Sequence, residues 1–207
     1  MTPDLSGLRI ADYLQALGSS AATPGGGSAA AFAGALASAL GRMVVSVAEE
    51  KESTPERQSL VAAFRDLETH FLSLAAEDEC AFAEVMDALR ISKEVASRQE
   101  RVQTALERAA AVPLRAARAS VSTLEHLLLV EPHASRSIVS DIGVAAHLAQ
   151  AALRSSLLNV HANLRSLKDV EARERLEREG NALGADADAA HDELVRRVAQ
   201  RLSAGHS

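Results

Sequence analysis

One acidic residue interrupts an apolar stripe in the middle of the chain. Between Leu60 and Leu89 the large apolar residues recur every three or four positions, as on one face of a helix, and Asp78 stands where the pattern calls for Leu or Phe. Burial raises the pKa of a carboxyl group toward the range where it exchanges protons near neutral pH. The pattern favours a general acid or base in a cleft. The alternatives are an aspartate that caps a neighbouring helix and a slightly rotated helix that leaves Asp78 at the rim of the core.

Three further polar residues, Asp141, Asn159 and Asn163, fall near one face of a later helical segment, with Ala145 and Ala152 between them. A groove floored by small side chains with polar groups at both ends suits an elongated ligand. Asp141 and Asn159 would lie about 27 Å apart along a straight helix, so they cannot both touch one small reacting centre. The alternatives are a helix-start carboxylate favoured by the helix dipole for Asp141, and hydrogen bonds between helices for the asparagines.

A glycine triplet opens an alanine-rich helical segment, which is expected to run from Ser28, as its N-cap, to about Glu50. Glycines can adopt positive φ and present bare backbone N–H groups, and the helix behind them adds the positive end of its dipole. This stretch predicts a site for an anion or a carbonyl-rich ligand, with a plain flexible turn as the alternative. The candidate binding residues here are Pro24, Gly25, Gly26, Gly27 and Ser28.

Other reactive residue types form no pattern. No His, Cys and carboxylate cluster has the spacing of metal ligands, so no metal is expected. The single Cys80 suits a reducing cytoplasm, and the first residues lack the pattern of a signal peptide. A net charge of −6 gives no global attraction to nucleic acid, and the uncharged run between Asp12 and Arg42 is weakly hydrophobic. We expect a cytoplasmic protein that binds neither nucleic acid nor membrane.

The elements that must position these residues are all helical. The chain has 207 residues, 2% of them aromatic, its apolar content is mostly Ala, Leu and Val, and no stretch alternates with period two. We expect a single domain, residues 1–207, folded as an all-α antiparallel bundle of long helices. Pro113 should kink or break its helix, and the small residues Ala30, Gly34 and Ser38 should bury their helix centrally or at a dimer seam. Helices are expected over 7–17, 28–50, 55–92, 102–112, 114–128, 137 or 140 to 167, and 170–202, with a loop at 131–133.

The order of the motifs resembles the formiminotransferase-cyclodeaminase C-terminal domain family over residues 8–200. The resemblance is carried by PGGGSAAAFAGALASALGRMV (24–44), DECAFAEVMDALRISK (78–93), RQERVQTALERAAAVPL (98–114), SDIGVAA (140–146) and LLNVHANL (157–164). One departure is Ile91-Ser92-Lys93, where family members often have Leu-Pro-Lys, and it bears on the substrate more than on the fold. The resemblance implies a dimer-forming helical bundle that acts on a tetrahydrofolate derivative.

The implied reaction is the closure of 5-formiminotetrahydrofolate to 5,10-methenyltetrahydrofolate with release of ammonia. The alternatives are a methenyltetrahydrofolate cyclohydrolase and a non-catalytic folate-binding or structural helical module. We expect the deaminase because that activity names the family. Both reactions move one proton at a tetrahedral carbon and need no cofactor beyond the tetrahydrofolate-borne substrate.

We hypothesise that Asp78 or Asp141 is the acid/base group of this reaction, with Asp78 preferred for its place in the apolar stripe. The other carboxylate would hold the pterin ring. Lys93, Arg98 and the glycine backbone are candidates to receive the glutamate carboxylates of folate. The residues expected to bind substrate are Pro24, Gly25, Gly26, Gly27, Ser28, Lys93, Arg98, Ser140, Asn159 and Asn163.

Overall fold

A computed structural model describes residue 7 and residues 9–204 of the chain. Its regular elements are helical throughout the described part, which confirms the all-α prediction. They are α1 (Ile10–Leu17), α2 (Gly26–Lys51), α3 (Pro55–Arg90), α4 (Arg98–Val130), the short 3₁₀ helix η1 (Glu131–His133), α5 (Val139–Leu164) and α6 (Val170–Ser203).

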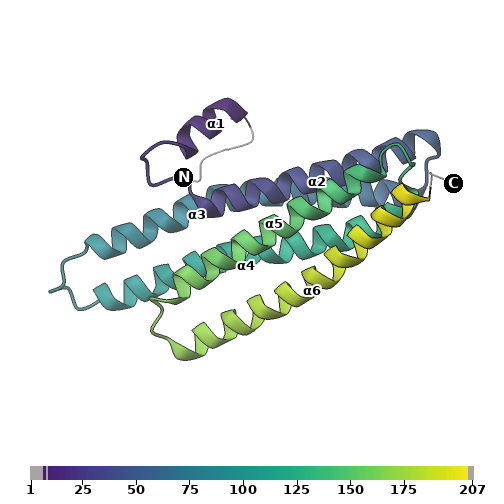
Figure 1. Ribbon diagram of the computed structural model, residues 1–207. Helices are drawn as coiled ribbons and strands as arrows, with labels where there is room; N and C mark the ends of the chain where they lie inside the picture. The colour runs from purple at the N-terminus through teal and green to yellow at the C-terminus, as the bar shows by residue number, and fades with distance from the viewer. Residues whose placement is uncertain (1–6, 8, 205–207) are drawn as a thin grey trace.

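The five long helices lie side by side in one bundle (Figure 1). The helix α2 packs on α3 and α5, α4 packs on α3 and α5, and α6 lies along α4 and α5. The short α1 lies beside the start of α2, outside the bundle of long helices (Figure 1). Because α3 and α4 extend beyond the start of α2, their side chains and those at the end of α5 are left to surround the N-terminus of α2.

Helix starts follow local chemistry where the sequence offers a strong cap. The Thr54 hydroxyl accepts a hydrogen bond from the Arg57 N–H, and Pro55 occupies the first helical position of α3. The Asp169 carboxylate likewise accepts from the Ala172 N–H at the start of α6. These starts confirm the predicted beginnings of both helices.

Other predicted boundaries were wrong. The helix predicted from residue 7 begins at Ile10, and the fifth long segment ends at Leu164 instead of 167. The loop expected at 131–133 is a turn of 3₁₀ helix. Pro113 does not break its helix. The helix α4 is continuous over its 33 residues, and Pro113 is buried in its interior.

The packing of α2 follows its row of small residues, because Ala30, Gly34 and Ser38 are all buried as predicted. The small residues face inward: a Cβ on Gly34 would lie 2.3 Å from Phe71 Cε1, and one on Gly41 would lie 2.5 Å from Phe64 Cε1. The rings of α3 therefore fill the space that the missing side chains leave. The larger stripe of α2 is partly open, and Leu36 is 45% exposed.

Length and composition alone would allow α2 to cross a membrane, and it is the one helix of the described part that passes this test. Half of its most apolar 18-residue stretch is buried inside the bundle. Packing on α3 and α5 accounts for the apolar composition of the helix.

Candidate functional site

A cavity of about 310 Å³ lies where α2 begins, between α3, α4 and α5. It brings together the glycine triplet, Asp78 and both asparagines, which come from three separate parts of the sequence. Its lining residues are Ala22, Thr23, Gly25, Gly26, Gly27, Asp78, Ala81, Phe82, Val85, Ala109, Asn159 and Asn163. Pro24 stands between two of these residues in the loop that leads from α1 to α2.

Gly27, the last glycine of the triplet, is explained by the close approach of Asp78. A Cβ on Gly27 would lie 2.2 Å from Asp78 Oδ1 and 2.4 Å from its Cγ, so no larger residue fits beside that carboxyl group. The expected positive φ angles are absent from the glycines of the described part, and Gly25 is extended at φ −127°. The sequence needs glycine here for space rather than for a left-handed backbone.

Ser28 does not cap α2 as predicted. The helix starts two residues earlier at Gly26, and Ser28 is completely buried within its first turn. The backbone N–H of Ser28 instead donates to the Asp78 carboxylate. The N–H groups of Gly26 and Gly27 have no partner within the described residues and lie at the cavity, where they can bind a ligand acceptor.

Asp78 is a half-buried carboxyl group without an ion pair in the described part of the chain. Burial raises its pKa above the ordinary value of 3.8, and the Ser28 N–H opposes this only in part. The cavity wall adds no cationic side chain, because its other members are apolar residues, glycines, Thr23 and the two asparagines. The group is therefore set to exchange a proton closer to neutral pH than a solvated aspartate.

The two asparagines keep their side-chain oxygens available. Asn159 Nδ2 donates to the Ser155 carbonyl at 2.9 Å, and the Asn159 amide lies 3.7 Å from where a Gly26 Cβ would stand. Asn163 Nδ2 donates across to the Ala109 carbonyl of α4 at 2.8 Å. With both nitrogens committed, the oxygens can accept hydrogen bonds from the N–H groups of a ligand.

The contact between Asn163 and Ala109 depends on Pro113. In a regular helix the N–H of residue 113 would donate to the carbonyl of residue 109, and proline has no N–H to give. Asn163 supplies the missing donor from α5. A proline that the sequence suggested as a helix breaker thus anchors an asparagine at the edge of the cavity.

Four predicted site residues do not line the cavity. Asp141 and Ser140 stand in the first turn of α5, about 27 Å along the helix from Asn159. Lys93 is exposed in the turn after α3. Arg98 donates to the carbonyls of Ile91 at 2.8 Å and Leu89 at 3.1 Å, so it ties the end of α3 to the start of α4 instead of facing the cavity.

Two residues beside the cavity were missed by sequence reasoning. Tyr13 of α1 is 5% exposed, and its hydroxyl lies 3.2 Å from Ser28 Oγ. Glu79 follows Asp78 in α3, and burial followed by the charge of Asp78 raises the pKa of its carboxyl group. The signals were the single tyrosine of the chain and a second acid next to the one already chosen.

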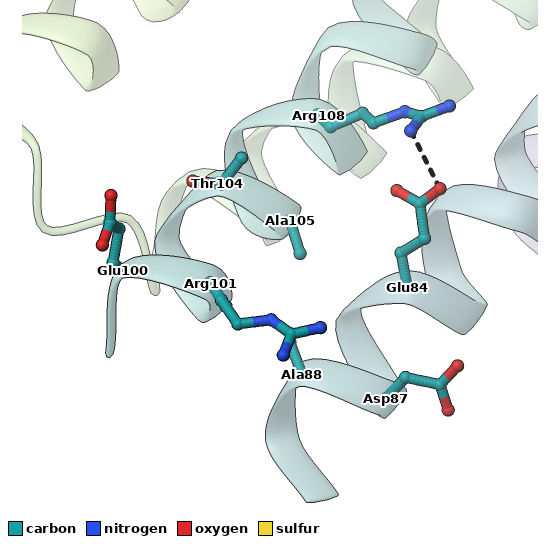
Figure 2. A pocket seen from close by; sticks show the side chains of 8 residues that line it. All are labelled: Glu84, Asp87, Ala88, Glu100, Arg101, Thr104, Ala105 and Arg108. Carbon is teal, nitrogen blue, oxygen red and sulfur yellow. Dashed lines mark hydrogen bonds and ion pairs between the residues drawn. The ribbon is translucent and has the colours of Figure 1, made fainter. Parts of the chain in front are cut away.

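A second cleft, of about 440 Å³, runs between α3 and α4 and contains neither Asp78 nor the glycines (Figure 2). The Arg108 guanidinium donates to Glu84 across it at 2.8 Å, and Asp87 is bound by Arg90 at 2.9 Å. Because these carboxylates are paired and exposed, the cleft lacks the unpaired buried acid that distinguishes the cavity at α2.

The fold and the cavity together define an all-helical protein with an acid/base site at the N-terminus of an inner helix. The sequence pattern described as formiminotransferase-cyclodeaminase matches residues 9–182. Methenyltetrahydrofolate cyclohydrolase of Methylorubrum extorquens is 33% identical over 202 residues, covering 94% of this chain and 97% of that protein. Formimidoyltransferase-cyclodeaminase of Mus musculus is 32% identical over 76% of this chain, which spans 30% of that longer protein.

A solved structure supports the same family assignment. Formiminotetrahydrofolate cyclodeaminase from Thermotoga maritima superposes with a TM-score of 0.85 at 26% identity, covering 96% of this chain and 97% of that one. The chain belongs to the formiminotransferase-cyclodeaminase family of folate-dependent cyclodeaminases and cyclohydrolases. The family prediction made from the sequence is confirmed.

Proposed function

We propose that this protein is a methenyltetrahydrofolate cyclohydrolase in which Asp78 transfers the proton. The observation that carries the chemistry is the half-buried, unpaired carboxyl group held between Gly27 and the Ser28 N–H. The choice of reaction is supported by the 33% identity to a cyclohydrolase of nearly the same length. This choice replaces our sequence-based preference for the deaminase, which remains the second candidate.

The reaction requires one group that both accepts and donates a proton. Water adds to the carbon of the methenyl bridge and loses a proton to the Asp78 carboxylate. The C–N bond to the ring nitrogen then breaks to leave the formyl group, as that proton passes from Asp78 to the departing nitrogen and the remaining hydroxyl proton is released to solvent. A pKa raised by burial suits both halves of the cycle, because the carboxyl group is neither a very weak base nor a very weak acid near neutral pH. The side-chain oxygens of Asn159 and Asn163 would accept hydrogen bonds from the pterin.

Formiminotetrahydrofolate cyclodeaminase is the alternative, favoured by the 0.85 TM-score to the protein of that name from Thermotoga maritima. Folate N10 would attack the formimino carbon and lose its proton to the Asp78 carboxylate. The ring would then close to the methenyl bridge as Asp78 gives that proton to the leaving ammonia. The same carboxyl group serves both reactions, because each forms and collapses a tetrahedral carbon that bears nitrogens.

Absorbance of the methenyl bridge separates the two activities. We expect the signal to fall when the protein is added to methenyltetrahydrofolate. A rise with 5-formiminotetrahydrofolate and no fall with the methenyl compound would assign the deaminase instead. No change with either compound, despite measurable folate binding, would contradict both and leave a non-catalytic folate-binding module.

We also propose a homodimer formed through the outer face of α2 and α5. Leu36 is 45% exposed, Val144 49% and Leu158 71%, and small residues between them form a shallow groove that another helix could enter. Sizing should give twice the chain mass of 21.8 kDa. Leu158→Glu should yield the monomer, whereas Leu129→Glu, which places the same charge on the 56% exposed Leu129 of α4, should not. A native protein that elutes as a monomer would contradict the proposal.

Asp141 lies too far from the cavity of its own chain to act there. The role predicted for it therefore requires a dimer in which Asp141 of one copy reaches the cavity of the other copy. If each site needs Asp78 of one copy and Asp141 of the other, Asp78→Asn and Asp141→Asn would each be inactive. Their equal co-expression would then restore about a quarter of the wild-type activity, since half of the dimers are mixed and one site in each is intact. Full activity of Asp141→Asn alone would exclude that role.

A further inference from the structure

A single side chain fastens α1 to the bundle. Tyr13 is the one buried residue in that helix, whereas Ile10 is 62% and Leu14 59% exposed. The Tyr13 ring stacks on Phe32 of α2 with centroids 5.0 Å apart, and its hydroxyl lies 3.2 Å from Ser28 Oγ. The contact of α1 with the bundle is therefore made beside the candidate site.

Ser28 connects this contact to the Asp78 carboxyl group. Its backbone N–H donates to Asp78, while its hydroxyl group faces both Tyr13 and Glu79. Because Ser28 is 0% exposed, its hydroxyl must find partners within the protein. A chain from Tyr13 O–H to Ser28 O–H to the Glu79 carboxylate satisfies each donor once.

Glu79 and Asp78 are neighbours in α3, so their side chains leave the helix about 100° apart. Asp78 turns into the cavity, and Glu79 turns toward Ser28 and Tyr13. Among the described residues the other ionisable side chain near the pair is Tyr13 of α1. The helix α2 carries none before Arg42, and α4 and α5 present Ala109, Asn159 and Asn163 at the cavity. Glu79 is therefore the second acid at this site, next to Asp78 in α3.

We propose that Glu79 and Tyr13 are positioning residues, which act on Asp78 through Ser28. Tyr13 and Glu79 hold the Ser28 hydroxyl from two sides and so fix the N–H that orients the Asp78 carboxyl group. Burial and then the charge of Asp78 raise the pKa of the Glu79 carboxyl group itself. This inference rests on the proposed role of Asp78 as the proton-transferring group.

The first test is Glu79→Gln, which keeps an acceptor for the Ser28 hydroxyl and removes the charge. Because the acceptor is kept, kcat and KM should each stay within about twofold of the wild-type values. Glu84→Gln is the matched control, because it removes the same charge from the same helix at a residue that is paired with Arg108 outside the cavity. A kcat in Glu79→Gln as low as that in Glu79→Ala would overturn the role of Glu79 as an acceptor for the Ser28 hydroxyl group.

The second test is Tyr13→Phe, which keeps the ring on Phe32 and removes the hydroxyl group. We expect kcat to fall by about 2- to 10-fold with KM nearly unchanged, the effect of one lost hydrogen bond on the reacting geometry. Glu79→Ala should lower kcat further than Glu79→Gln. Wild-type kcat in both Tyr13→Phe and Glu79→Ala would overturn the positioning role.

Asp78→Asn distinguishes a failure of the positioning proposal from a failure of the proposed function. If Asp78→Asn is inactive while the Tyr13 and Glu79 variants match the wild type, the positioning proposal fails and the proposed function stands. If Asp78→Asn retains full turnover, the proposed function fails, and the positioning proposal fails as well because it depends on Asp78.

Discussion

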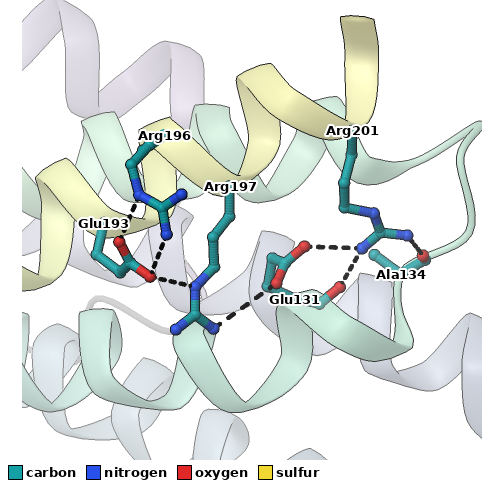
Figure 3. A network of polar contacts seen from close by, with 6 residues as sticks. All are labelled: Glu131, Ala134, Glu193, Arg196, Arg197 and Arg201. Atoms are coloured by element: carbon teal, nitrogen blue, oxygen red, sulfur yellow. Dashed lines mark hydrogen bonds and ion pairs between the residues drawn. The ribbon is translucent and has the colours of Figure 1, made fainter. Parts of the chain in front are cut away.

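Two carboxyl groups are removed from water at opposite ends of the bundle, and they are treated in opposite ways. Asp78, at the N-terminus of α2, has a backbone N–H and no cation in the described part of the chain. Glu131, in the 3₁₀ turn after α4, is 6% exposed at its side chain and lies between two arginines of α6 (Figure 3).

At the Glu131 end, ion pairs and hydrogen bonds hold neighbouring helices together. Arg201 donates to Glu131 Oε1 at 2.9 Å and to the carbonyls of Glu131 and Ala134, and Arg197 lies 3.8 Å from Oε2. These contacts tie α6 to the turn between α4 and α5 (Figure 3). The comparison shows that a buried acid with fixed cations supports the fold, whereas one left without a cation keeps a proton available for chemistry.

The largest effect on the Asp78 end of the bundle is expected from Gly27→Ala. The new Cβ would stand 2.2 Å from Asp78 Oδ1, so the carboxyl group must move, and a displacement of this size should lower kcat by about 100-fold or more. Gly26→Ala is the matched control, since its Cβ would meet Asn159 Oδ1 at an ordinary 3.7 Å. Equal kcat values for the two variants in a turnover assay would contradict the account of the glycine triplet.

At the other end, Arg201→Ala should affect stability and leave turnover intact. It removes the main partner of a buried carboxylate, and the free energy of unfolding should fall by about 3 kcal/mol. Urea unfolding followed by circular dichroism measures the loss, with Arg178→Ala as a control on an exposed pair of the same helix. Lost activity in folded Arg201→Ala, with stability unchanged, would reverse the roles given to the two ends.

Asn163→Ala tests the link between the cavity and the proline of α4. It leaves the Ala109 carbonyl without the donor that replaces the missing N–H of Pro113, and this should cost about 1–2 kcal/mol of stability. KM for the folate should rise as well, because an acceptor for the pterin is lost. The Pro113→Ala, Asn163→Ala double variant should recover part of the stability, since a backbone N–H returns to that carbonyl. No recovery would contradict the link.

The smallest expected effect is the pH dependence of stability. Because burial raises the pKa of Asp78, the folded chain holds that proton more tightly than the unfolded chain, and stability falls as the pH rises past 3.8 until the folded pKa is exceeded. Asp78→Asn removes this cost, so the variant should be more stable than wild type at pH 7 and no more stable below pH 3.8.

Glu193 provides the opposite case on α6. Hydrogen bonds from Arg196 and then Arg197 lower the pKa of its carboxyl group from 4.5 to about 2, so its contribution is present above 4.5 and is lost as the pH falls toward 2. Glu193→Gln should therefore lower the Tm at pH 7 and change it less at pH 2. Thermal unfolding of Asp78→Asn and Glu193→Gln between pH 2 and pH 7 measures both effects. A change in Tm of the same sign in the two variants at pH 7 would contradict the contrast.

Much of the fold could be predicted from local signals. Pro55 and the 170–202 periodicity gave the helices correctly, because caps and apolar spacing act within a few residues. The start of α2 and the continuity of α4 could not, because distant residues decide them. Asp78 takes the Ser28 N–H that a cap would have satisfied, and Asn163 satisfies the carbonyl that Pro113 leaves open.

The same limit applies to the site. Periodicity put Asp78 and Asn159 on inward faces, and the structure brings them to one cavity with the glycines. The sequence could not show that Arg98 is occupied by the end of α3, or that α1 folds back to place Tyr13 on Ser28. Faces of helices can be read from spacing, but distances between them depend on how the helices pack.

The most direct test of the central claim is the turnover of methenyltetrahydrofolate and 5-formiminotetrahydrofolate by folded Asp78→Asn. The side chain keeps its shape and loses the ability to carry a proton. We expect the rate to fall by about 100-fold or more while folate binding and the helical spectrum are preserved. Turnover at the wild-type rate would show that the unpaired acid at the glycine-lined cavity is not the proton-transferring group.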